Sequence, residues 1–140
     1  MENELKINLN DQEKDLLLKD LCSRVPYGVK VITSVGGEIR NDKEQLNFAQ
    51  LSLFEAGHED VKPYLFPLSS MTEEQSLELE IITGETIGFD AYSIHDFTGY
   101  SEISLSKILE IIQWCYENHF DINGLIPMGL ANDATGLNIY

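Results

Sequence analysis

Apolar residues change their spacing along this chain, and that change most constrains the fold. The run Lys30-Val-Ile-Thr-Ser-Val is β-branched, which favours a strand. Between Ser104 or Ser106, which can cap a helix, and about Asn118, the spacing is helical. One side of that predicted helix is a continuous stripe: Ile108, Ile111, Ile112, Cys115 and His119, widened by Trp114 and Tyr116. One chain that contains both patterns is neither all-α nor all-β.

Local signals place another helix and a hairpin in the first 40 residues. Asn10 or Asp11 can cap a helix that begins near Gln12 and ends at about Arg24, before Pro26 and Gly28. Its predicted inner side holds Leu16, Leu17 and either Cys22 or Leu21. Gly36-Gly37 suits a two-residue turn from which residues 38–40 return as a second strand.

The middle of the chain is harder to assign. Residues 45–54 alternate roughly with period two, which predicts one or two strands. Residues 62–68 form an apolar run bracketed by prolines, which confines it to an edge strand or a loop. Capping boxes from Ser70 to Glu73 and from Thr72 to Gln75 predict the start of a further helix, although the residues that follow also fit a strand. Residues 84–100 are predicted to form a loop or an insertion. We predict a single α+β domain over residues 1–140, with two or three helices packed on a small, mainly antiparallel sheet.

Charge is distributed unevenly. The chain has 9 basic and 24 acidic residues, a formal charge of −15, yet its 43% hydrophobic content is that of a folded domain. The first 62 residues carry 8 − 12 = −4, whereas the remaining 78 carry 1 − 12 = −11, with Lys107 their single basic residue. Such a field repels nucleic acid and anionic membranes and attracts basic protein surfaces or cations.

The sequence also predicts a compartment. It lacks the basic start and apolar run of a secretory signal, and no stretch approaches the roughly 18 apolar residues of a membrane span. We therefore expect a soluble, cytoplasmic protein. Cys22 and Cys115 lie far apart in apolar, helical surroundings, so we interpret them as reduced core thiols and not as a disulfide.

Catalytic and metal-binding motifs are missing. His58, His95 and His119 are too widely spaced for a compact metal site, and no phosphate-binding loop or nucleophile elbow occurs. The pair His95-Asp96 fits loop packing better than acid–base work. We predict a protein that is not an enzyme and has no cofactor or metal; a metal-assisted hydrolase built on Glu85, Asp90 and His95 is the weakest alternative.

Four segments, in order, carry a resemblance to a known family. They are residues 15–30, residues 62–75 with the run Lys62-Pro-Tyr-Leu-Phe-Pro-Leu, residues 118–121, and residues 124–131 with the run Gly124-Leu-Ile-Pro-Met-Gly-Leu-Ala. Together they resemble a family of short uncharacterised proteins encoded by bacteriophages and mobile elements of Bacteroidota-type bacteria. The resemblance implies a genomic setting and no activity, and residues 82–100 have no counterpart in it.

These observations favour a non-catalytic interaction protein of phage or mobile-element origin. Its acidic surface would occupy a basic, nucleic-acid-binding surface of a host defence protein or ribonucleoprotein, as an anti-CRISPR-like inhibitor does, and binding would weaken with salt. The predicted partner-binding residues are seven acids and two aromatic anchors: Glu73, Glu74, Glu78, Glu80, Glu85, Asp90, Asp96, Tyr92 and Phe97. An alternative of equal weight is that these acids bind no partner and only keep the protein soluble. Residues 125–130 either seal the core, which we favour, or form an exposed patch through which a small regulatory or housekeeping protein self-associates.

Overall fold

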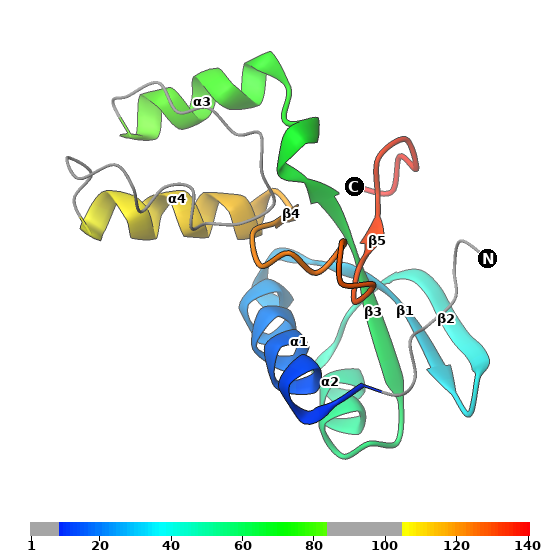
Figure 1. Ribbon diagram of the computed structural model, residues 1–140. Helices are drawn as coiled ribbons and strands as arrows, with labels where there is room; N and C mark the ends of the chain where they lie inside the picture. The colour runs from blue at the N-terminus through cyan, green and yellow to red at the C-terminus, as the bar shows by residue number, and fades with distance from the viewer. Residues whose placement is uncertain (1–8, 84–104) are drawn as a thin grey trace.

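The computed structural model describes residues 9–83 and 105–140, and within them four α-helices accompany a mixed five-stranded sheet (Figure 1). The α+β prediction is confirmed, with one α-helix more than expected and with parallel as well as antiparallel pairing. The helices are α1 (Asp11–Arg24), α2 (Phe48–Glu55), α3 (Glu73–Thr83) and α4 (Leu105–Glu117). The strands are β1 (Lys30–Val35), β2 (Glu38–Gln45), β3 (Asp60–Pro67), β4 (Phe120–Asp121) and β5 (Asn132–Asp133).

Helix α1 begins where its capping residues predict. The Asn10 side chain accepts a hydrogen bond from the Glu13 amide, and the Glu13 carboxylate accepts one from the Asn10 amide, which completes a capping box. Leu17 and Leu21 are buried, but Cys22 is exposed, so its assignment to the core was wrong. Both cysteines are free.

Strands β1 and β2 form the predicted hairpin. Gly36 and Gly37 have φ angles of 58° and 84°, the positive values that a tight two-residue turn requires. β2 lies at the edge of the sheet, and its sequence EIRNDKEQ carries charges of both signs and register irregularities against β1. Such an edge resists pairing with another chain.

Residues 48–55 form helix α2, so the strand prediction for this region was wrong. Asn47 and Gln50 exchange side-chain and backbone hydrogen bonds in a second capping box, and this local signal outweighs the approximate alternation. Leu51 and Phe54 are buried, whereas Leu53 is exposed.

Strand β3 is central to the sheet, so its prediction as an edge strand or a loop was also wrong. Residues 60–63 pair antiparallel with β1, while residues 64–65 and 66–67 pair parallel with β5 and β4. Pro63 therefore lies where the neighbours of the strand change, a position at which a missing amide hydrogen is tolerated.

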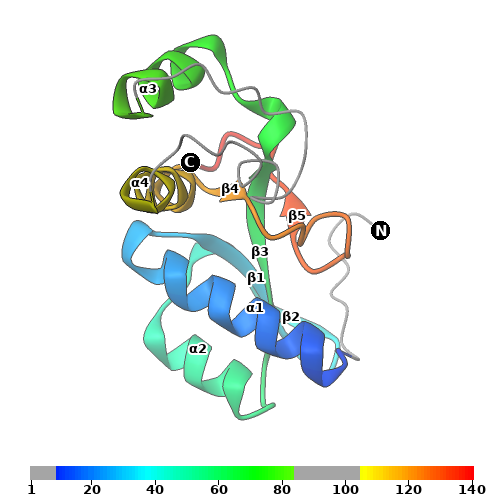
Figure 2. The same cartoon turned by 60° about the vertical axis from the view of Figure 1, so that its left-hand side comes forward.

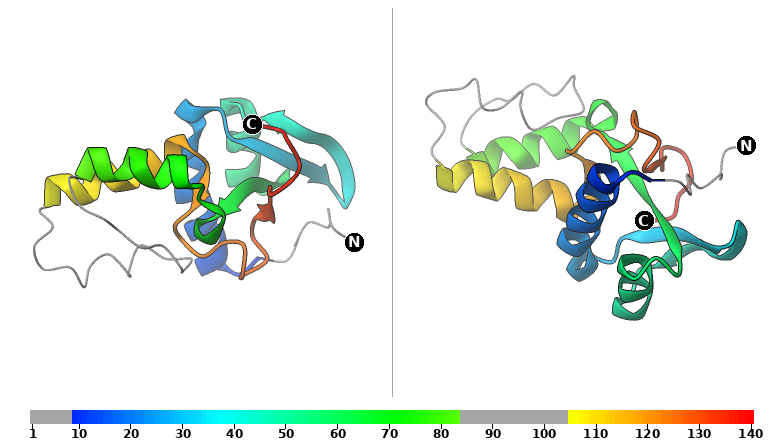
Figure 3. Two further views of the ribbon diagram at one scale, coloured as in Figure 1. Left: turned by 90° about the horizontal axis from the view of Figure 1, so that it is seen from above. Right: turned by 60° about the horizontal axis from the view of Figure 1, so that its bottom comes forward.

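Helices α3 and α4 pack side by side and extend away from the sheet; we call this pair the arm (Figures 2 and 3). Of the two predicted capping boxes, the second is present: Thr72 Oγ1 accepts from the Gln75 amide and Gln75 Oε1 from the Thr72 amide. Ser70 instead donates to the Pro67 carbonyl.

Two principal cores stabilise the molecule. The body core joins α1, α2, β1 and β3. Leu125 and Leu130 belong to it, so the predicted sealing of the core is confirmed for these two residues, whereas Met128 between them is 41% exposed. The arm core is formed by Leu68, Leu79, Ile111, Trp114, Cys115, Phe120 and Ile122. On the second face of the sheet, Ile32, Tyr64 and Ala134 make a smaller cluster.

Candidate protein-interaction surface

The structure describes four of the nine predicted partner-binding residues, and all four lie on α3. Glu73, Glu74 and Glu78 are exposed, and Glu80 is half-buried. The other five lie outside the described residues, as does His95: Glu85, Asp90, Tyr92, Asp96 and Phe97. The described part of the acidic prediction is therefore a single helical surface.

Exposed residues of α3 occupy one side of the helix, which we call the outer face: Glu73, Glu74, Leu77, Glu78 and Ile81. Leu77 and Ile81 are 58% and 83% exposed, while Leu79, on the opposite side, is buried in the arm core. At 100° per residue, Leu77 and Ile81 fall in the middle of this face. Glu73 flanks them on one side, and Glu74 and Glu78 flank them on the other.

Helix chemistry explains part of this acidity. Glu73 and Glu74 lie in the first turn, where the macrodipole favours negative charge by about 0.3–1 kcal/mol each. Glu78 accepts a hydrogen bond of 3.0 Å from Trp114 Nε1, which joins α3 to α4. Glu78 therefore has a structural partner as well as an exposed carboxylate.

No residue of α3 is basic, so its four carboxylates have no opposite charge within the helix. Eight of the nine Lys and Arg residues of the chain precede residue 63. Two ion pairs form there outside the core: Lys19–Asp15 is largely exposed, and the Lys43 and Asp42 side chains are 36% and 34% exposed. Charge compensation is therefore concentrated in the body, and the arm is left acidic.

A buried ion pair lies where α1, α4 and β4 meet. Arg24 and Asp20 have no exposed side-chain surface, and the Arg24 guanidinium binds both carboxylate oxygens of Asp20 and the Phe120 carbonyl. The guanidinium also lies 4.7 Å from the centre of the Tyr116 ring. The burial of this pair was not predicted, although the spacing of Asp20 and Arg24 by four residues on one helix is a signal for it.

Two further polar residues extend this cluster. Asn123 donates to Asp20 Oδ2 over 2.7 Å, and Asp121 accepts from the amides of Leu125 and Ile126. Burial raises the pKa of Asp121, opposed by these two amides and by Arg24. The cluster thus fixes the turn after β4 against α1, which is a structural role.

His119 follows α4 in a left-handed conformation, with φ of 64°. Its ring stacks on Tyr140 with centroids 3.6 Å apart, and its buried Nδ1 has no hydrogen-bond partner. Burial, assisted by the charge of Arg24, lowers the pKa of His119 to about 4. A helix C-terminus favours a charged histidine, but this ring is neutral near pH 7 and therefore gains nothing from the helix dipole.

Tyr140 fastens residues 134–140 across the sheet. Its hydroxyl accepts from the Lys30 amide and donates to the Tyr64 carbonyl, each over 2.7 Å. Burial raises the pKa of Tyr140 to about 12 and that of Cys115 to about 12, so neither ionises near neutral pH. These buried groups serve packing.

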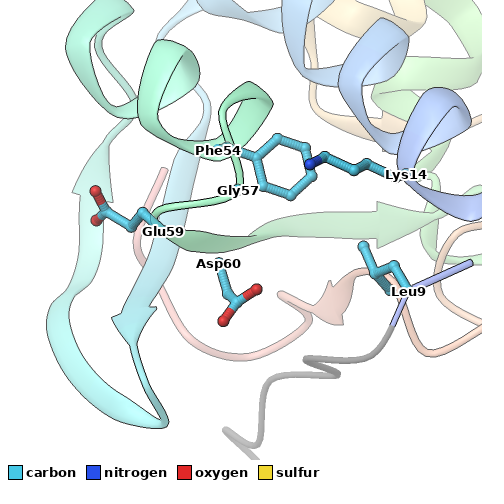
Figure 4. A pocket seen from close by; sticks show the side chains of 6 residues that line it. All are labelled: Leu9, Lys14, Phe54, Gly57, Glu59 and Asp60. Carbon is cyan, nitrogen blue, oxygen red and sulfur yellow. The ribbon is translucent and has the colours of Figure 1, made fainter. Parts of the chain in front are cut away.

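A hollow of about 150 Å³ opens between α1 and the end of α2 (Figure 4). Lys14 Nζ lies 5.7 Å from the centre of the Phe54 ring, and Asp60 lies beside them. Burial raises the pKa of Asp60, opposed by Lys14. Because the wall residue Leu9 directly follows residues outside the described range, we assign this hollow no ligand.

Across residues 9–83 and 105–140, no three His, Cys, Asp or Glu side chains gather as a metal site would require. The helices described there are also too short or too polar to cross a membrane. His58 is exposed, and the His119 ring is stacked on Tyr140.

Comparisons of this chain with protein-family models, with curated proteins and with solved structures find no match.

Proposed function

We propose that this protein is a non-catalytic interaction protein whose acidic arm binds a basic surface of another protein. The observation that carries the proposal is the outer face of α3, where Glu73, Glu74 and Glu78 are exposed on a helix without a basic residue. Carboxylates so arranged raise the association rate with a basic partner and disfavour nucleic acid itself.

The resemblance to phage and mobile-element proteins supplies the biological setting of the proposal. The partner would be a nucleic-acid-binding protein or ribonucleoprotein of a host defence system in the cytoplasm, inhibited as by an anti-CRISPR protein. In that role the carboxylates occupy positions that phosphates would otherwise take, and binding weakens steeply as salt rises.

The test compares two triple variants with equal changes in charge. E73Q/E74Q/E78Q removes three charges from the arm, and the control E38Q/E44Q/E55Q removes three exposed charges from the body. Each tagged protein is used to capture partners from a nuclease-treated lysate of a Bacteroidota-type bacterium, at low and at high salt.

We expect a stoichiometric, salt-sensitive partner for the wild type and the body variant. The arm variant should lose at least about tenfold in affinity, or 1.4 kcal/mol. Equal losses in both variants would show that net charge alone is responsible, and capture of no partner by the wild type would refute the proposal.

A second candidate is self-association through α2. Phe48 and Leu53 are 74% and 42% exposed, and Glu55 is the only charged residue of that helix. Two copies with a charge of −15 each can approach most closely where charge is scarce. Light scattering at high salt should then report a dimer that F48Q/L53Q dissociates; a monomer at all concentrations removes this candidate.

A further inference from the structure

The composition of the outer face of α3 restricts what can bind it. Leu77 and Ile81 are one helical turn apart at its centre, and the three carboxylates form its rim. An apolar centre with a charged rim is the arrangement of protein–protein binding sites, in which buried apolar anchors supply most of the affinity.

A surface that imitates phosphates alone does not need these two side chains. Leu77 and Ile81 are 58% and 83% exposed, so on a purely nucleic-acid-binding surface they would lie against the polar and charged groups of the partner. Those partner groups would lose their hydration and gain no hydrogen bond in return. The occupant must therefore offer an apolar strip between positive charges.

Charge also excludes a second copy of this chain from the same face. Two outer faces brought together would oppose three carboxylates with three carboxylates, and α3 has no basic residue to relieve the repulsion. The exposed apolar surface of α2 does not have this rim, because Glu55 is its single charge.

We infer that the outer face of α3 binds a basic amphipathic helix of a protein partner, with Leu77 and Ile81 inserted into its apolar strip and Glu73, Glu74 and Glu78 paired with its Lys or Arg residues. This rests on the proposed function and specifies the chemistry of the partner. Helix-to-helix docking through anchors spaced by four residues is an established mode of recognition.

The experiment uses two synthetic peptides of equal positive charge, each about 14 residues long, or four helical turns. One carries Leu at helical spacing among Lys residues, and in the other every Leu is replaced by Gln. Binding of each peptide to the full chain is measured by titration calorimetry at low and high salt, for the wild type and three variants.

Wild type should bind the Leu/Lys peptide at least tenfold more tightly than the Gln/Lys peptide. L77Q/I81Q should lose this preference and keep a weak, salt-sensitive interaction, while E73Q/E74Q/E78Q should weaken binding of both peptides. V35T/I39T, which removes two exposed apolar side chains from the β1–β2 hairpin, should behave as wild type. Gln favours helix nearly as well as Leu, so these variants keep α3 formed, which circular dichroism checks.

The outcomes separate this inference from the proposal beneath it. Equal binding of the two peptides, or a preference that survives in L77Q/I81Q, overturns the inference. The charge-dependent capture described above would be unaffected by that result. A preference lost equally in V35T/I39T also overturns it, since the apolar contact would then not be specific to α3. Loss of the lysate partner without a difference between the triple variants would instead refute the proposed function.

Discussion

The body and the arm of this molecule are built differently. In the body, both faces of the sheet are covered, and α1 and α2 lie over one of them. Where α1 meets the arm, even a charged pair is fully buried. In the arm, Leu79 is the only fully buried residue among the described residues of α3. Leu77, Ile81 and three carboxylates of the same helix are exposed.

The two regions therefore contribute different things: the body contributes most of the stability, and the arm contributes an exposed surface. Burial of apolar side chains contributes most of the folding free energy, and the body provides most of it. Helix α3 is attached through Leu79 on its inner side, and Glu78, at the edge of the outer face, also accepts a hydrogen bond from Trp114. Among the described residues, the rest of the outer face is exposed. Substitutions in the cores and on the outer face of α3 test this division.

Arg24→Met should have the largest effect, because it leaves the Asp20 carboxylate buried without its cation. Loss of one partner from a buried ion pair costs about 3–5 kcal/mol of unfolding free energy. Urea unfolding followed by circular dichroism measures it. The double variant D20N/R24M should recover much of the loss. If R24M retained wild-type stability, the pair would not be a structural element of the junction between α1, α4 and β4.

Leu79→Ala should cost about 2–4 kcal/mol, since it creates a cavity in the arm core. The single tryptophan of the chain, Trp114, lies in that core and stacks on Phe120 with centroids 5.6 Å apart. In this variant, the fluorescence of Trp114 should therefore change at a lower urea concentration than the circular dichroism of the whole chain, to which the body also contributes. Coincident transitions would contradict the separation of arm and body.

How much of this was predictable depended on the range of each signal. The helix cap at Asn10 and the Gly36-Gly37 turn each depend on a few neighbouring residues, and both formed as predicted; the capping box that Glu13 completes was not predicted. The capping box that begins α2 is equally local, but the rough alternation of residues 45–54 obscured it.

Other features could not be predicted because they depend on partners that lie far away in the sequence. Pro63 fits a central strand because β1 and β5 pair with different halves of β3, which nothing near Pro63 indicates. Arg24 is buried because a carbonyl 96 residues away accepts its hydrogen bond. At the candidate site, the acids of α3 were evident, whereas the central position of Leu77 and Ile81 required knowing that the segment is a helix and that Leu79 lies inside.

His119 should make stability depend on pH. Its folded-state pKa of about 4 lies below the ordinary value of 6.5, so the unfolded chain binds the proton more tightly. The contribution is present above pH 6.5 and is lost as pH falls from 6.5 towards 4. Because the ring is only partly buried, we expect about 1–2 kcal/mol after solvent screening. Urea unfolding of wild type and H119N, compared at pH 7.5 and pH 5, isolates it, because Asn tolerates the left-handed backbone. Equal pH dependence in both proteins would contradict it.

L77Q/I81Q should have the smallest effect on stability, within about 0.5 kcal/mol of wild type in urea unfolding. Both side chains are mainly exposed, and Gln favours helix nearly as well as Leu, so little free energy is lost on folding. The contrast with Leu79→Ala, two residues away on the same helix, is the sharpest form of the comparison. If L77Q/I81Q instead destabilised the chain as much as Leu79→Ala, both faces of α3 would be needed for folding. The outer face would then be part of a core, and no surface for a partner would remain on the arm helix.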